Sequence, residues 1–395
     1  MNESPISENI QAPRAARLSG LSGNEMYCAA LLGFEPGNLL VGNSVFSLGF
    51  FGGIGSSLRT LVGGEITQYT EMINEGRRLS LSRFESELAE SQGDGATGVT
   101  SELIFHPGNV EFLTIGSTIH RTSGSSDKPF TSSSDAQELF SQWDAGYTPI
   151  DFVFGNVAYA IGIGRGFTGA FRQLARGEVR QYSDIFATTR NLALDRITAE
   201  AREKGANSIV GVRTSILPIG TSAVQEMAML GTASYNPDIA ALAATVGGVT
   251  TSDLTAEETW NVAKLGYAPQ RIVIGTSVYS LGIVGGVFAA LKNLVKGEIS
   301  QMTELIYGAR EESLSKVRAQ ATEVGADDVL GIKTYIYDLG GGLIEFLAIG
   351  TAVKKVDGLK TVSPQLPPQA IIRDKDTFVD TANVAYGANL QNPVR

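Results

Sequence analysis

The chain has 395 residues, of which 43% are hydrophobic and 18% are charged, so it can bury the cores of several domains. Its formal net charge of −10 argues against nucleic-acid phosphates as partners, and its single cysteine, Cys28, excludes an intrachain disulfide. Because residues 1–20 lack the apolar core of a signal peptide, we expect a cytoplasmic protein.

One sequence pattern occurs three times. The segments LLGFEPGNLLVGNSVFSLG, DAGYTPIDFVFGNVAYAIG and KLGYAPQRIVIGTSVYSLG are versions of each other, and their glycines Gly33, Gly146 and Gly266 set the register. The same register aligns Gly64, Gly177 and Gly297, and it extends to the closing segments IGSTI, LGTAS and IGTAV. Self-similarity at this spacing predicts three copies of one domain.

The predicted organisation has three repeats joined by polar segments. The repeats span residues 22–118, 134–234 and 255–353. An N-terminal arm (1–21), two linkers (119–133 and 235–254) and a C-terminal tail (354–395) account for the rest of the chain. We expect these segments to be linkers or loosely ordered arms, although residues 239–246 are apolar enough to dock as a helix.

Each repeat opens with a short helix that ends at a Gly-aromatic-x-Pro turn. The helix starts carry capping-box pairs, in which two side chains satisfy free backbone N–H groups. These pairs are Ser22 with Glu25, Ser134 with Gln137, and Thr255 with Glu258.

The remainder of each repeat is clearest in the third copy. A β-rich run at Ile272–Ile274 leads into a glycine-rich stretch, and helical spacing of apolar residues then predicts a long amphipathic helix that ends at Gly325. Two strands follow, Val329–Tyr337 and Leu343–Val353. The fold class is therefore α+β: three tandem β-α-β-β domains, each with a helix layer on a small antiparallel sheet.

These residues resemble the YbjQ family (UPF0145) of small bacterial proteins. The resemblance is strongest in KNLVKGEISQMTELIYGAREESLSKVRAQATEVGADDVLGI and in the closing GTAV. It implies a dodecin-like fold whose single-domain members form pentamers with a propeller-like ring of sheets. A three-stranded sheet has two open edges, and ring closure would remove them.

The family has also been described as heavy-metal-binding, and here this sequence departs from it. Cys28, His106 and His120 are its only soft or borderline ligands, and none of them recurs in the other repeats. We therefore expect no transition-metal site common to the three domains, no cofactor and no catalytic residues.

Three further sets of residues recur at matching positions. Acids lie at the predicted start of the long helix, where they favour helix capping; the alternative is a site for a hard cation. Arginines lie twelve residues later and favour an ion pair between subunits; the alternative is an exposed, solvated side chain. The acids are Glu65, Glu178 and Glu298; the glutamines that follow them are Gln68, Gln181 and Gln301; the arginines are Arg77, Arg190 and Arg310.

Recurring glycines lie between the first strand and the long helix. The motif Gly164-x-Gly166-x-x-Gly169 is in the setting of a dinucleotide fingerprint, but only its middle glycine is kept in the other repeats. Tight backbone bends are the favoured interpretation. They are predicted at Gly49, Gly53, Gly162, Gly166, Gly282 and Gly286.

Two uncharged stretches, Leu39–Leu58 and Ile272–Leu291, are long enough to span a bilayer. The corresponding stretch of the second repeat carries Arg165, which argues against a repeated transmembrane span. The sequence as a whole favours a non-enzymatic scaffold that forms a homo-oligomeric ring. If fivefold closure is retained, the simplest form is a homopentamer of three stacked rings; otherwise two or three chains could close a ring of six or nine domains. The alternatives are a binding module for a small anion or hard cation, and a membrane-associated oligomer.

Overall fold

The computed structural model describes residues 16–47, 64–124, 128–160, 177–219, 224–280, 300–340 and 343–367. The first repeat contains α1 (Gly23–Leu31), β1 (Phe34–Ser47), α3 (Thr67–Glu90), β3 (Gly95–His106) and β4 (Asn109–Arg121). The second contains α4 (Ala136–Asp144), β6 (Thr148–Ala160), α6 (Arg180–Glu203), β8 (Ser208–Pro218) and β9 (Val224–Tyr235). The third contains α8 (Ala256–Lys264), β11 (Tyr267–Ser280), α10 (Ser300–Glu323), β12 (Asp328–Gly340) and β13 (Leu343–Lys355).

The predicted α+β class and the β-α-β-β order are confirmed in each repeat. The three long strands are antiparallel, and the last strand of the repeat lies in the middle, in the orders β1-β4-β3, β6-β9-β8 and β11-β13-β12. The long helix packs on the first strand of its own repeat. This contact is close because a glycine faces the helix backbone in every copy, at Gly42, Gly155 and Gly275.

All three short helices begin at capping boxes, and the predicted residues are the right ones in two of them. The pairs Ser22 with Glu25 and Thr255 with Glu258 are confirmed. The prediction for the second repeat was wrong by one residue, because Asp135 is the N-cap and Glu138 completes the box. The Asp135 carboxylate accepts hydrogen bonds from the backbone N–H groups of Gln137 and Glu138, as an N-cap side chain does.

The segments predicted as linkers contribute strands to the preceding repeat. In the first, β5 (Phe130–Thr131) pairs in parallel with β3, and in the second, β10 (Thr250–Thr251) pairs in parallel with β8. The helical docking predicted for residues 239–246 is confirmed by η2 (Pro237–Ile239) and α7 (Ala240–Thr245), whose Leu242 and Ala243 are buried. The expectation of loosely ordered joints was therefore wrong for these parts.

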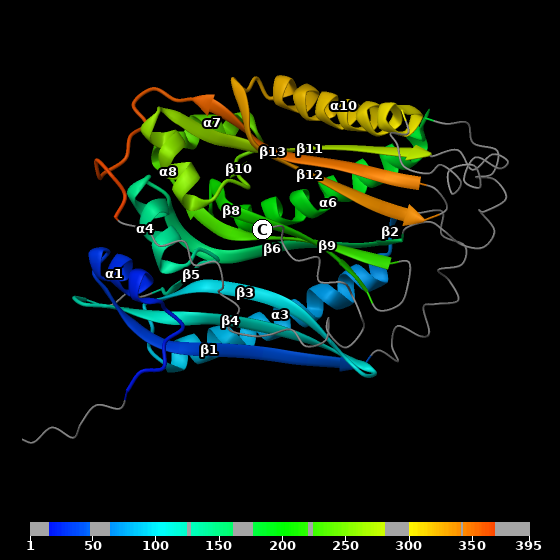
Figure 1. The fold of residues 1–395 in the computed structure, drawn as a ribbon. Helices are drawn as coiled ribbons and strands as arrows, with labels where there is room; N and C mark the ends of the chain where they lie inside the picture. The colour runs from blue at the N-terminus through cyan, green and yellow to red at the C-terminus, as the bar shows by residue number, and fades with distance from the viewer. Residues whose placement is uncertain are drawn as a thin grey trace, which may run out of the picture.

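A short strand before α3 and another before α6 each pair with the following repeat. Strand β2 (Gly64–Glu65) pairs with the end of β6, and β7 (Gly177–Glu178) pairs with the end of β11. Helices α3 and α6 also pack on the first strand of the next repeat, α3 on β6 and α6 on β11. Figure 1 shows the result: sheets and helices alternate through the molecule, and α3 and α6 each lie between two sheets while α10 is outermost.

The predicted backbone bends lie outside the described residues, as does Glu298. The glycines predicted at these bends are Gly49, Gly53, Gly162, Gly166, Gly282 and Gly286.

The tail predicted from residue 354 is described up to residue 367. Its Leu359 is buried in a cluster that includes Trp260 and Ala263 of α8. Ser363 donates a hydrogen bond from its backbone N–H to the Asp144 carboxylate at 2.9 Å, so this part of the tail contacts the second repeat.

Candidate functional site: the interface between repeats

The first strand of a repeat has both faces covered when another repeat precedes it. One face of β6 contacts its own helix α6, while Phe152 and Phe154 enter a groove of the first repeat lined by Phe84 and Val99. The next interface repeats this arrangement with Ile272 and Ile274 of β11. They pack on Leu194, Ile197 and Val212 of the second repeat. Burial of these side chains is the main driving force for joining the repeats.

A buried ion pair crosses each of these interfaces. The guanidinium of Arg77 on α3 contacts the carboxylate of Glu226 on β9 at 2.9 Å, and their side chains are 1% and 0% exposed. The guanidinium of Arg190 on α6 contacts Glu345 on β13 at 2.8 Å, and both are fully buried. The predicted ion pairs therefore form at Arg77 and Arg190, but they join repeats of one chain.

Further hydrogen bonds hold the second pair in place. Arg190 donates to the Tyr159 hydroxyl at 2.6 Å, and Thr276 donates to Glu345 at 2.9 Å. Burial alone would lower the pKa of Arg190, but the charge of Glu345 and the hydrogen bonds that Arg190 donates to Glu345 and Tyr159 outweigh burial and keep the pKa above its ordinary value. The arginine therefore stays charged, and removing its partner would leave an isolated charge in the interior.

The recurring acids also bind cations of the following repeat. Glu65 contacts Arg196 of α6 at 2.7 Å, and Glu178 contacts Lys316 of α10 at 2.9 Å. Burial alone would raise the pKa of Glu178, but the hydrogen bond and charge of Lys316 lower it overall. The prediction that these acids lie in the first helical turn was wrong, because Glu65 and Glu178 belong to β2 and β7, and the helices begin two residues later.

The glutamines that follow these acids are near the helix starts. Gln68 and Gln181 lie in the first turns of α3 and α6 and are exposed, and Gln301 lies in the first turn of α10. Their recurrence in all three repeats favours a role at the helix start or in assembly, and this role stays a prediction. The hard-cation alternative for the acids also stays a prediction, since the structure places Glu65 and Glu178 each against a basic side chain.

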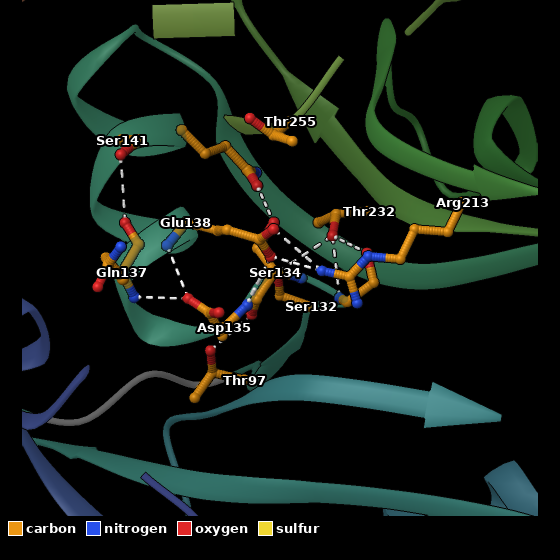
Figure 2. A network of polar contacts seen from close by, with 12 residues as sticks. Thr97, Ser132, Ser134, Asp135, Gln137, Glu138, Ser141, Arg213, Thr232 and Thr255 are labelled. Atoms are coloured by element: carbon orange, nitrogen blue, oxygen red, sulfur yellow. Dashed lines mark hydrogen bonds and ion pairs between the residues drawn. The ribbon is translucent and has the colours of Figure 1, made fainter. Parts of the chain in front are cut away.

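The linker between the first two repeats forms a polar network, shown in Figure 2. Thr97 of β3 donates to the carbonyl of Ser134 at 2.7 Å, while the hydroxyls of Ser132 and Thr232 of β9 are 3.1 Å apart. Arg213 of β8 reaches Glu138 of α4 at 2.8 Å. These contacts fix the start of α4 against both sheets and so set the position of the second repeat on the first.

The linker between the second and third repeats makes equivalent contacts, with the charged side chain of Asp253 at the position of Ser133. The backbone N–H of Asp253 donates to the Thr351 hydroxyl at 3.0 Å, and the Asp253 carboxylate contacts Lys333 at 3.1 Å. A cavity of about 260 Å³ lies here, lined by both the Arg213 pair and the Lys333 pair. Because the charged groups lining it already neutralise one another, the cavity is a poor match to a charged ligand.

The two histidines, which are potential metal ligands, are far apart. His106 pairs with Asn109 across the β3–β4 hairpin, and His120 lies eleven residues further along β4, roughly 36 Å away at the usual rise of a strand. Cys28 is on α1, and burial, followed by the charges of nearby acids, raises the pKa of its thiol to about 11. These ligands therefore do not fit a heavy-metal site. Among the described residues, there is also no group of three His, Cys, Asp or Glu side chains that could hold a metal ion.

The uncharged stretches considered as membrane spans form sheet strands where the structure describes them. Residues 39–47 belong to β1 and residues 272–280 belong to β11. None of the helices in the described part of the chain has the length and hydropathy needed to cross a membrane.

The fold and the buried interfaces define a tandem-repeat protein whose domains associate through one recurring contact. Residues 36–104, 147–236 and 258–356 match the model of the YbjQ family, which carries the description "Putative heavy-metal-binding". The chain belongs to the YbjQ family.

Individual relatives match one or more of the repeats. An encapsulin nanocompartment protein of Mycobacterium tuberculosis is 29% identical over 221 residues, which cover 53% of this chain and 82% of that protein. A UPF0145 protein of Pseudothermotoga lettingae is 37% identical over 87 residues, which cover 21% of this chain and 82% of that protein. Another from Saccharolobus islandicus is 40% identical over 83 residues, which cover 21% of this chain and 73% of that protein.

Sequence reasoning missed the acidic partners of the arginines. Glu226 and Glu345 each stand within an apolar closing strand, in VQEMAM and LIEFLA, and Glu111 stands at the same position in NVEFLT. A charge that recurs inside a buried strand must have a partner, because burying an isolated carboxylate is very costly. That pattern could have predicted the buried acidic partners of Arg77 and Arg190, whereas Glu111 is 18% exposed.

A buried acid on α6 leads to a stability prediction. Glu200 accepts from the N–H of Phe154 at 3.2 Å and contacts Arg78 at 3.2 Å, and burial raises its pKa despite the charge of Arg78. The third repeat has Gln320 at this position, and its side-chain oxygen accepts from the N–H of Ile274 at 3.0 Å. Glu200→Gln should therefore keep the backbone contact and remove a buried charge.

We expect Glu200→Gln to melt at a higher temperature than the parent protein at pH 8, with a smaller gain at pH 5. A raised pKa means that the folded parent binds a proton before the unfolded chain does, so the parent regains stability as the pH falls. Thermal melts at both pH values measure this effect. Glu87→Gln changes the equivalent but exposed residue of the first repeat and serves as the control. A lower melting temperature for Glu200→Gln at pH 8 would contradict the argument.

Proposed function

We propose that this protein is a non-enzymatic structural protein that self-assembles into a homo-oligomer. The observation that carries the proposal is the recurring contact itself: two interfaces in one chain use the same strand face, the same helix and an equivalent buried Arg–Glu pair. Such a contact joins unlike surfaces of neighbouring domains. A heterologous contact of this kind generates rings when its rotation closes and filaments when it does not.

The similarity to an encapsulin nanocompartment protein supports an assembly role. The stacked-ring form predicted from the sequence requires polar linkers to join separate rings, whereas consecutive repeats of this chain share large apolar contacts. The stacked rings therefore stay a prediction, while the cover that the preceding repeat provides for the second apolar face of β6 and β11 supports a different arrangement. We infer that an assembly extends the order of repeats found in the chain.

Electron microscopy of the purified, negatively stained protein tests the assembly. We expect discrete rings or filaments that are clearly larger than one chain of 41.8 kDa. A field of uniformly small particles of single-chain size, at concentrations where the parent protein is fully folded by circular dichroism, would contradict a scaffold role.

A further inference from the structure

The two halves of the repeat interface are left open at opposite ends of the chain. Among the described residues, no repeat packs on the groove side of the third repeat, and none packs on the strand side of the first repeat. Figure 1 shows α10 at one outer surface of the layers and the sheet containing β1 at the other. The residues at both surfaces occur at the same positions as those buried inside the chain.

On the third repeat, the groove side is exposed. Arg310 stands at the position of the buried Arg77 and Arg190, yet its side chain is exposed and has no acidic partner among the described residues. Ile332 is 47% exposed, whereas Val212 at the same position in the second repeat is 2% exposed. A groove of about 350 Å³ lies between α10 and β12, lined by Leu314, Val317 and Ile332 among others.

On the first repeat, the strand side is exposed. Val41 is 40% exposed, although the matching Phe154 and Ile274 are buried in the groove of the preceding repeat. Val45 is 58% exposed, while the matching Ala158 and Val278 are fully buried. An outward face of apolar side chains on a strand is costly to leave in water.

The acid that matches the buried glutamates is present at this end. Glu111 of β4 occupies the position of Glu226 and Glu345, and its side chain is 18% exposed. It accepts a hydrogen bond from the Asn43 amide at 3.2 Å, as Glu345 does from Thr276, and it contacts the His106 ring at 2.8 Å. The carboxylate is therefore already oriented by the same neighbouring strand as its buried counterparts.

We propose that a second copy of this chain docks on these surfaces, with the first repeat of one chain filling the groove of the third repeat of another and Arg310 binding Glu111 of that next chain. The contact continues the interface that joins the repeats within one chain, and its two sides complement each other in shape and charge. The inference deepens the proposed self-assembly and rests on it.

Charge reversal with rescue tests this pairing. Arg310→Glu would place two carboxylates together at the contact between chains, and Glu111→Arg would place two guanidinium groups together there. Each variant alone should therefore fall to the mass of one chain, 41.8 kDa, by light scattering. An equimolar mixture of the two variants allows contacts between opposite charges and should recover assemblies larger than one chain. Both residues lie at the surface, and circular dichroism melts check that each variant folds.

The matched control is Arg180→Glu on α6, because the Arg180 side chain is 88% exposed and its loss should leave the assembly mass unchanged. The docking proposal is overturned if both reversal variants assemble like the parent, and also if the mixture stays monomeric while the parent assembles. In either case self-assembly itself would stand and use another surface. A monomeric parent protein would overturn both proposals and indicate that parts of the same chain cover the two ends.

Discussion

Replacing Arg190 by methionine is expected to lower the free energy of unfolding by about 3–5 kcal/mol, the usual cost of removing one member of a buried ion pair. The reason is that Glu345 would remain fully buried with a charge that Thr276 alone cannot balance. Urea unfolding followed by circular dichroism measures the loss. The unfolding of the second and third repeats in urea should change most, because the pair joins α6 to β13.

Two further variants show whether the loss comes from the unpaired charge. The double variant Arg190→Met with Glu345→Leu should recover most of the lost stability, because apolar side chains of similar volume can replace a buried pair at little cost. Arg180→Met on the same helix should change the unfolding free energy by less than about 0.5 kcal/mol, since Arg180 is exposed. A double variant as unstable as the single variant would show that shape, and not charge, dominates this interface.

Replacing Gly155 by alanine is expected to destabilise the second repeat by about 1–3 kcal/mol or more, the cost of overpacking a tight contact. A Cβ atom at this position would overlap the carbonyl oxygen of Ala193 and approach the backbone nitrogen of Ile197 at 2.5 Å, both on α6. The backbone of a helix cannot move aside as a flexible side chain can. Because α6 also covers β11, the displacement should reach the interface with the third repeat.

The substitution Gly308→Ala is expected to have the opposite effect on stability and serves as the comparison. It lies within α10, and the nearest atom to an added Cβ is the Tyr279 hydroxyl at 4.0 Å. Gly308→Ala should raise stability by roughly 0.5–1 kcal/mol, since alanine restricts the unfolded chain and favours the helix. If Gly155→Ala is tolerated as well as Gly308→Ala in thermal melts, the close packing of β6 on α6 is not as the structure describes it.

Local signals in the sequence predicted the architecture of each repeat. Recurring glycines such as Gly155 aligned the copies, the helical spacing in residues 299–321 predicted α10, and the apolar run at residues 343–353 predicted β13. These features depend on contacts within one repeat, so their periodicity is visible in a short window. The capping box of the second repeat was misplaced because Ser134 and Asp135 are both good N-cap residues.

The contacts between repeats were harder to predict, because they join residues that are far apart in the sequence. Arg77 and its partner Glu226 are separated by 149 residues, and no local pattern connects them. Likewise, the apolar residues on both faces of β11 indicate a buried strand, but they do not reveal that the preceding repeat covers one face. The acids at Glu65 and Glu178 resembled helix caps, and only the geometry shows that they pair with Arg196 and Lys316.

Sedimentation equilibrium of the unmodified protein over a range of concentrations tests the central claim most directly, because it measures the number of chains that associate. Assembly through the open ends predicts a mass of several times 41.8 kDa, either fixed for a closed ring or rising with concentration for a filament. A single species of 41.8 kDa at every concentration would contradict the account.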